Sequence, residues 1–389
     1  MNFNFDGTIV RRGSSCIKWD GMEKFLGSGN ALPMWVADMD FLTPNYITEA
    51  LVERAKHGVF GYAYREDGFY TSLIDWLKRR HQWSVERDWI VFSPGVVPAV
   101  NLCVLAMTEV GGKIVVQPPV YFPFFTAVKD HGRELVYNPL IEKDGRLCMD
   151  MDNLESLAKQ GAKMLILCSP HNPGGSVWTR SELEEMAKIC LRYNMIILSD
   201  EIHCDLVYAP HKHIPVASLS KEIGMQTITT VAPSKTFNLS GLATSAVVIE
   251  NDSMRRRFVA TLEHLHIGGG NVFGNLASEM AYTHGDEYVD SLMKYLAGNV
   301  DELERYAEEH LPLIKVFRPE ATFLVWLDCW EMRMEDKALN EFFLYRAKVG
   351  LNPGAMFGPG GEGFMRMNIG CPKSTLIEGL DRIRIALEG

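Results

Sequence analysis

The sequence has no apolar stretch long enough to span a membrane, which takes about 18 residues or more. Its N-terminus, MNFNFDGTIVRRG, carries no apolar core behind the basic pair Arg11 and Arg12, so a secretory leader is not predicted either. We therefore expect a cytoplasmic protein with no membrane partner.

Basic runs and cysteine pairs are also scarce. No basic run in the 389 residues is longer than three residues, as at 255–257, and the formal net charge is −10, so no nucleic-acid partner is predicted. The 8 cysteines are scattered without a C-x-x-C pair. This pattern argues against a disulfide framework and a zinc knuckle, and it predicts reduced thiols.

What the sequence does contain, from about residue 86 onward, is a series of short apolar runs rich in β-branched residues. Unbroken runs of this kind are typical of strands buried on both faces of a largely parallel sheet. Helical patterns separate them, and the clearest begins with a capping box, Thr179 and Glu182, and extends to about Tyr193. The sequence therefore predicts an α/β domain. The predicted strands are 89–92, 113–117, 134–137, 164–168, 195–199, 227–232 and 245–250.

A smaller α+β unit is predicted after this domain. The pattern turns helical after about residue 251 and stays so to about 310, with a glycine-rich break at 268–270. Strands are then expected within 316–328 and 363–370, and helices near 335–347 and from about Lys373. No internal repeat is visible.

Polar motifs follow five of the predicted strands at the point where each strand ends. In an open parallel sheet, ligands bind in the crevice outside the carboxyl ends of the strands. The five loops offer a helix start opened by glycine, a tyrosine, an asparagine, an acid and a lysine. They are SPGVVPAV (93–100), PPVYFPF (118–124), SPHNPGG (169–175), DEIH (200–203) and PSKTFNLSG (233–241).

Pyridoxal 5′-phosphate is a cofactor that needs all of these groups. It requires a lysine amine for a Schiff base and an acid that keeps the ring nitrogen protonated, so that the ring can accept electrons. Lys235 and Asp200 are the candidates for these two roles. Asn172 is the candidate donor to the phenolic oxygen, although an asparagine in such a motif also forms ordinary Asx turns.

The phosphate and the ring face have candidates as well. Gly95, Val96 and Val97 open a helix with Pro98 in its first turn, which leaves N–H groups free to face an anion. Many helix starts of this kind bind nothing. Tyr121 is the candidate for stacking on the ring, although an aromatic residue in VYFPFF is as often part of a core.

Two other interpretations of the acidic motif are weaker. The sequence DEIH has the form of a helicase acidic box, but such a box needs an upstream P-loop. The pair Gly112 and Lys113 does not belong to a P-loop sequence. A metal site would need His203, Cys204, Asp205, His211 and His213, whose spacing is neither helical nor that of a knuckle. No metal is predicted.

Seven motifs resemble those of the fold-type I pyridoxal-phosphate enzymes of the class I/II aminotransferase superfamily, and within it the cystathionine β-lyase, or C–S lyase, branch. The resemblance implies the aspartate aminotransferase fold, with a mostly parallel central sheet in a large domain (45–284). It also implies a small α+β domain (285–389) that is joined by the N-terminal segment (1–44). The motifs are PMWVADMDF (33–41), HGVFGY (57–62), SPGVVPA (93–99), SPHNPGG (169–175), SDEIH (199–203), SKTFNLSGL (234–242) and RMNIG (366–370).

The resemblance also implies roles for single residues. Lys235 would form the Schiff base, Asp200 would contact the ring nitrogen, and Asn172 and Tyr121 would contact the phenolic oxygen and the ring face. Arg366 would bind the substrate carboxylate with its planar fork. Trp35 and Ala37 would line the substrate pocket. Tyr62 would reach the phosphate in the other subunit of a homodimer with shared active sites.

The sequence departs from the pattern of many aminotransferases of this fold at two positions. Ala243 stands where those enzymes carry a phosphate-binding arginine, so the phosphate is expected to rely on the helix start at Gly95, on Ser234 and on Tyr62. His203 stands where they carry a tyrosine. We expect it to touch the cofactor or to pack behind Asp200.

The reaction implied by the resemblance is α,β-elimination. L-Cystathionine or a related L-cysteine S-conjugate would give a thiol (homocysteine or sulfide), pyruvate and ammonia. An aminotransferase built from the same parts is the alternative, and a non-catalytic binding protein on the same fold is a more distant one.

Overall fold

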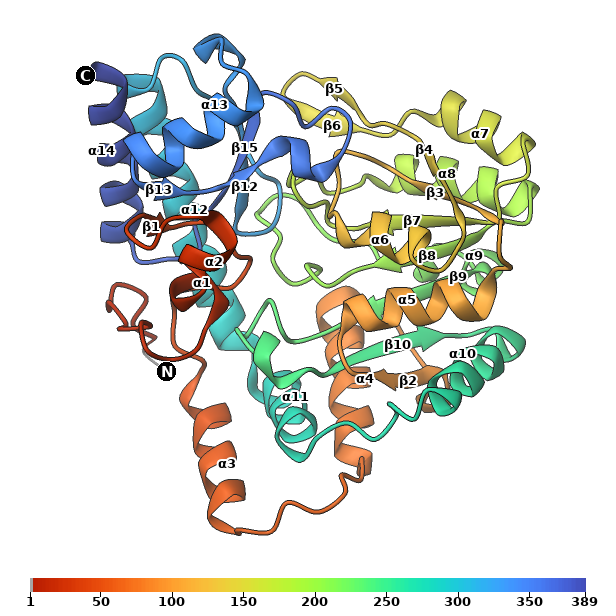
Figure 1. Cartoon of the computed structure of the whole chain (residues 1–389). Helices are drawn as coiled ribbons and strands as arrows, with labels where there is room; N and C mark the ends of the chain where they lie inside the picture. The colour runs from red at the N-terminus through yellow and green to blue at the C-terminus, as the bar shows by residue number, and fades with distance from the viewer. Residues whose placement is uncertain (1–2) are drawn as a thin grey trace.

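The computed structural model describes residues 3–389, and a seven-stranded sheet forms its centre (Figure 1). All seven predicted strands lie in this one sheet. Neighbouring strands are parallel except at β10, which runs antiparallel to both β2 and β9. The prediction of a largely parallel sheet is therefore confirmed. The spatial order is β2 (Ile90–Ser93), β10 (Ser245–Ile249), β9 (Thr227–Val231), β8 (Ile196–Asp200), β7 (Met164–Cys168), β3 (Lys113–Val116) and β4 (Glu134–Tyr137).

Helices cover both faces of this sheet. Ile166 and Leu198 face one group of helices, whereas Leu165 and Ile197 face the other, because successive side chains of a strand point in opposite directions. Both faces are thus apolar, which explains the unbroken apolar runs. The first group is α5 (Val96–Met107), α6 (Pro123–Lys129) and α10 (Asp252–His264), and the second is α7 (Met151–Lys159), α8 (Arg180–Arg192) and α9 (Lys221–Gln226).

The capping box predicted at the start of α8 is present. The Thr179 side chain accepts a hydrogen bond from the Glu182 amide at 3.2 Å, and the Glu182 carboxylate accepts one from the Thr179 amide at 2.8 Å. The two bonds satisfy amides that a helix start would otherwise leave unpaired.

A smaller antiparallel sheet lies beside the first, at the upper left of Figure 1. It contains β11 (Lys315–Phe317), β12 (Leu324–Asp328), β15 (Phe364–Asn368) and β14 (Asn352–Pro353). The long helix α12 (Asp286–His310) and the last helix α14 (Lys373–Glu388) share its apolar core. Helix α13 (Asp336–Glu341) continues into a π-helical turn, Phe342–Arg346. The two together form the helix predicted near 335–347.

The N-terminal segment reaches this smaller unit, since β1 (Leu32–Pro33) pairs in parallel with β13 (Val349–Gly350). The domain boundaries after residues 44 and 284 stay a prediction. Helix α4 (Asp67–His81) packs against α11 (Val272–His284) beside the large sheet. The other elements are α1 (Ile17–Asp20), α2 (Met22–Leu26), α3 (Asn45–Lys56), β5 (Ile141–Lys143), β6 (Arg146–Cys148) and short 3₁₀ turns at Arg87–Trp89, Val216–Ser218, Ser240–Leu242, Trp330–Met332 and Gly354–Phe357.

Two expectations about the whole chain can be checked against residues 3–389. In that range no helix is both long and apolar enough to cross a bilayer. All eight cysteines fall within it and are free.

Candidate active site

A cavity of about 260 Å³ lies where the motif-bearing strands of the large sheet end. Most of the predicted site residues line it together. These are Ala37, Gly95, Val96, Val97, Tyr121, Asn172, Asp200, His203, Ser234 and Lys235. The sequence analysis assigned no role to Cys168, Ser240 and Thr244, which line the same cavity. Ser240 lies within the motif SKTFNLSGL (234–242), whereas Cys168 and Thr244 flank motifs.

Lys235 stands on the connection between β9 and β10. Its Nζ donates a hydrogen bond to the carbonyl oxygen of Ala37 at 2.7 Å. Burial, reinforced by the positive charge of Arg366, lowers the pKa of Lys235 to about 8. At pH 7 about a tenth of this amine is therefore uncharged, as a nucleophile or a base must be, and about half is uncharged at pH 8.

Asp200 is the last residue of β8 and is buried. Both hydrogen bonds of its carboxylate reach Oδ1, from the Ile202 amide at 3.1 Å and from the Thr230 hydroxyl at 3.4 Å. Burial raises the pKa of Asp200 to about 7. A cationic ring nitrogen beside this buried carboxylate would supply the positive partner that it otherwise lacks. The carboxylate would in turn keep that nitrogen protonated.

Arg366 on β15 is a buried guanidinium whose hydrogen bonds all reach neutral oxygens. It donates to the side chains of Asn172 at 2.8 Å and Asn352 at 2.6 Å, and to the carbonyl of Trp35 at 2.9 Å. Its Nε has no partner within residues 3–389, and its guanidinium lies 4.9 Å from the ring centre of Phe357. Burial lowers the pKa of Arg366 to about 10. The group is thus suited to a carboxylate brought by a ligand.

The helix start at one end of the cavity is shaped for an anion. Gly95 caps α5 with a φ of 130°, a conformation that favours glycine, and the helix begins at Val96. The first amides of a helix have no acceptor within it, so they are available to a phosphate. Ala243 lines the cavity here, and the hydroxyl-bearing residues Ser240 and Thr244 stand near it in the sequence.

His203 and Tyr121 complete the lining. The buried Nδ1 of His203 has no hydrogen-bond partner within the described chain, and its ring centre lies 6.2 Å from that of Phe323. Burial, with the charges of Lys235 and Arg366, lowers the pKa of His203 well below its ordinary value, so the ring is neutral. Burial also raises the pKa of the Tyr121 hydroxyl.

Three predicted residues, Arg366, Trp35 and Tyr62, lie outside the cavity lining, although Arg366 bonds the lining residue Asn172. Trp35 contributes its carbonyl to Arg366, while its indole N–H is turned to the carbonyl of Lys18 at 3.0 Å. Tyr62 is fully exposed. Its predicted role requires a second subunit and stays a prediction.

The segment that carries Ala37 is held by a partly buried ionic cluster that the sequence analysis did not identify. Arg11 bonds Asp38 at 2.8 Å and Asp40 at 2.7 Å, and Lys18 bonds Asp40 at 2.7 Å. The N-terminal residues therefore fix the backbone that contacts Lys235. No local motif indicated this, because the partners are separated along the chain.

The residues fit pyridoxal 5′-phosphate group by group. The cavity combines a buried amine of lowered pKa, a buried carboxyl group without a bonded cation, an aromatic residue and a helix N-terminus. The buried Nδ1 of His203, which has no hydrogen-bond partner within residues 3–389, adds a polar atom that a ligand could bond. These are the groups that the ring, its substituents and its phosphate require.

Comparison with known proteins gives the same assignment. The family model for aminotransferases of class I and II matches residues 32–383. The cystathionine β-lyase PatB of Bacillus subtilis is 44% identical, and the alignment covers 99% of this chain and 100% of that protein. Cystalysin from Treponema denticola, solved with pyridoxal 5′-phosphate, superposes with a TM-score of 0.97 at 34% identity, covering 100% of this chain and 99% of that one. The C–S lyase from Staphylococcus hominis, also solved with the cofactor, gives 0.93 at 32% identity over 100% and 99%.

Proposed function

The chain belongs to the class I and II aminotransferase family, and on this basis we propose that it is a pyridoxal-phosphate enzyme that acts as a carbon–sulfur β-lyase. The observation that carries the proposal is the likeness, over nearly the whole chain, to a cystathionine β-lyase. The cavity supports it, because it holds the groups that a pyridoxal-phosphate lyase needs.

When bound, the cofactor supplies an aldehyde that captures the substrate amino group and a pyridinium ring that accepts the electron pair left at the α-carbon. Asp200 keeps the ring nitrogen protonated. Arg366 holds the α-carboxylate and so fixes the orientation of the α-carbon. The Nζ of Lys235 takes the α-proton as a general base, and the thiolate then leaves from the β-carbon.

The substrate class follows from the relatives. L-Cystathionine and water would give homocysteine, pyruvate and ammonia, and other L-cysteine S-conjugates would give the corresponding thiol. Asn172, Trp35 and Ala37 would position the substrate beside Arg366. Gly95, Val96, Val97, Tyr121, His203 and Ser234 would hold the cofactor.

A direct assay separates this function from that of an aminotransferase. The purified protein with its cofactor and L-cystathionine should release thiol and pyruvate in equal amounts without any added keto acid. An aminotransferase would form product only when a keto-acid acceptor is supplied. Failure to release thiol or pyruvate from any β-thio amino acid would refute the lyase proposal.

Substitution of Arg366 tests the carboxylate contact. Arg366→Lys keeps the charge but loses the planar fork, and charge-assisted hydrogen bonds contribute about 1.5–3 kcal/mol each. We expect KM for cystathionine to rise by roughly 10- to 100-fold with a smaller change in kcat, measured by thiol release. Arg318→Lys, at an exposed arginine of the same unit, is the control and should leave KM unchanged. An unchanged KM in Arg366→Lys would contradict the assignment.

The lowered pKa of Lys235 predicts how the protein without cofactor takes it up at different pH. Only the neutral amine reacts with the aldehyde, and half of it is neutral at about pH 8. The rate of cofactor uptake, followed by absorbance, should rise about tenfold per pH unit below pH 8 and level off above it. A lysine with the ordinary pKa of about 10.4 would still show that rise between pH 8 and 10.

We further propose a cytoplasmic homodimer in which Tyr62 reaches the phosphate of the other subunit. The supporting observation is the exposure of Tyr62 together with its exposed neighbours Val59, Phe60 and Tyr64, since exposed apolar patches mark contact surfaces. Sedimentation should give a dimer, and Tyr62→Phe should weaken cofactor retention. A monomer with unimpaired cofactor binding would contradict this proposal.

A further inference from the structure

A second cavity, of about 660 Å³, lies behind the candidate active site. Consecutive residues face the two cavities: His203 lines the first, whereas Cys204 and Asp205 line the second. His81 and His213 also line the second cavity. The sequence analysis considered a metal site made of His203, Cys204, Asp205, His211 and His213. The structure does not bring these five residues together, because His203 lines the other cavity.

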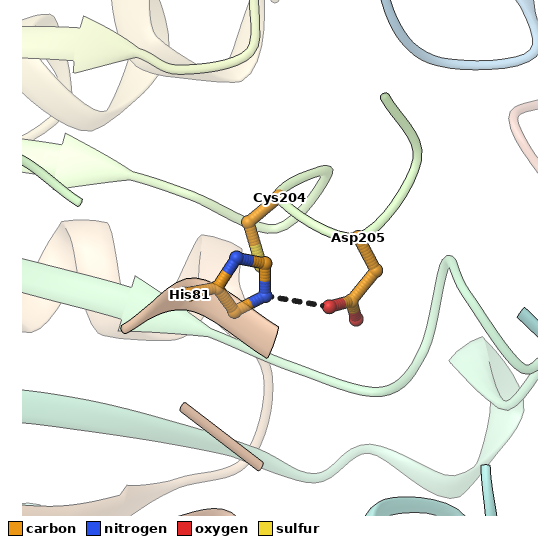
Figure 2. Close-up of side chains that lie close together, drawn as sticks. All are labelled: His81, Cys204 and Asp205. Carbon is orange, nitrogen blue, oxygen red and sulfur yellow. Dashed lines mark hydrogen bonds and ion pairs between the residues drawn. The ribbon is translucent and has the colours of Figure 1, made fainter. Parts of the chain in front are cut away.

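A different set of possible metal ligands does come together on the wall of the second cavity (Figure 2). Donor atoms of His81, Cys204 and Asp205 all lie within 4.8 Å of one another. His81 is the last residue of α4, and the other two residues stand in the turn after β8. The His81 Nε2 lies 2.8 Å from Asp205 Oδ1. Because 124 residues separate these two, no sequence spacing indicates the cluster.

We propose that His81, Cys204 and Asp205 bind a divalent zinc-class metal ion. Imidazole, thiolate and carboxylate are all established zinc ligands, and a site with three protein ligands leaves the fourth tetrahedral position open. The thiolate and the carboxylate together carry two negative charges, which offset the two charges of the ion in these buried surroundings. The open position would face the cavity.

The geometry of the His81 and Asp205 pair requires little movement. Two ligands about 2.0–2.1 Å from a tetrahedral ion lie roughly 3.3 Å apart. The His81 and Asp205 atoms need to separate by only a fraction of an ångström from their present distance. Asp205 is already oriented by two donors, the indole N–H of Trp76 at 2.9 Å and the hydroxyl of Thr236 at 3.0 Å. Outer donors of this kind fix the ligands of metal sites.

Two of the cationic residues that line the cavity, Arg79 and Arg80, are already paired with carboxylates. Arg79 is paired with Asp286 at 2.9 Å and Arg80 with Asp290 at 2.8 Å, so both guanidiniums have their own carboxylates. Burial raises the pKa of the Cys204 thiol well above its ordinary value, and the negative charge of Asp205 raises it further. Metal binding must therefore expel the thiol proton to the solvent as the S–metal bond forms. The affinity should accordingly increase with pH.

The test uses the complete enzyme with its cofactor, stripped of metal with a chelator and then equilibrated with Zn²⁺ or Co²⁺ in the absence of air. We expect about one ion per chain, a visible cobalt spectrum of tetrahedral intensity and release of about one proton per ion at pH 8. Cys204→Ser should weaken binding by at least about tenfold. This variant is informative because the Cys204 thiol makes none of the hydrogen bonds that hold the cluster among residues 3–389.

Cys190→Ala is the matched control, since this thiol is also buried and free but lies on α8 outside the cluster. It should bind the ion as the parent does, and melting curves should show that both variants are folded. Equal binding by Cys204→Ser and the parent would overturn the proposal, because the Cys204 thiolate would then not be a ligand of the ion. So would a stoichiometry far below one. Neither result depends on whether the protein is a lyase.

Discussion

Lys235→Ala should lower kcat/KM for thiol release from cystathionine by at least about three orders of magnitude. A positioned general base contributes about 10²- to 10⁴-fold, and this lysine is also the residue to which the cofactor would be bound. Steady-state assays at saturating cofactor measure the change. Borohydride reduction should label Lys235 in the parent protein, and labelling at another lysine would refute the assignment.

Two further variants separate a chemical role of Lys235 from a structural one. Lys235→Arg keeps a positive charge at the site but has no amine that can lose its proton at neutral pH, so it should be about as inactive as the alanine variant. Lys143→Ala changes an exposed lysine and should leave the rate unchanged. Added ethylamine should partly restore Lys235→Ala, because a small amine can take the α-proton in the space left by the side chain. Retention of a tenth or more of the activity in Lys235→Ala would contradict the mechanism.

Asp200→Asn should lower kcat by about 10²- to 10³-fold. An opposite charge nearby shifts a pKa by roughly one to three units, and each unit corresponds to a factor of ten in protonation. Asparagine keeps the size and the hydrogen bond from the Ile202 amide but not the charge, so the ring nitrogen would lose its proton more readily. The measurements are kcat and the absorbance spectrum of the bound cofactor as a function of pH.

Asp200→Glu is the matched variant for this prediction. It restores the charge while displacing it by one methylene, and it should recover part of the lost rate. If Asp200→Asn stays within about threefold of the parent, the carboxylate does not govern the ring, and its burial would need another explanation.

The large sheet and half of the site follow from the sequence for a simple physical reason. Strands buried on both faces produce continuous apolar runs, and strands β7, β8 and β9 are neighbours in the sheet in the order of the chain. Asn172, Asp200 and Lys235 follow these three strands, so parallel pairing brings them to one edge. Local pattern and tertiary structure agree at these positions.

The rest of the site depends on contacts that local patterns do not encode. Arg366 comes from a strand of the other sheet and bonds Asn172, and only the family resemblance indicated that it would belong to the site. The bonds from Arg11 and Lys18 to the segment near Ala37, and the contact of His81 with Asp205, join residues far apart in the sequence. No periodicity records such pairings, since they arise only when the elements pack.

The reversed direction of β10 has a consequence for the lysine. Because β10 runs antiparallel to β9, with Ala246 opposite Val231, the chain re-enters the sheet at the same edge that it leaves. The connection that carries Lys235, residues 232–244, is therefore tethered at both ends to adjacent strands at one edge of the sheet. A loop closed in this way has already lost most of its conformational entropy in the folded protein. Little of that entropy remains to be lost when substrate binds, so the binding energy stays available for orienting the α-carbon.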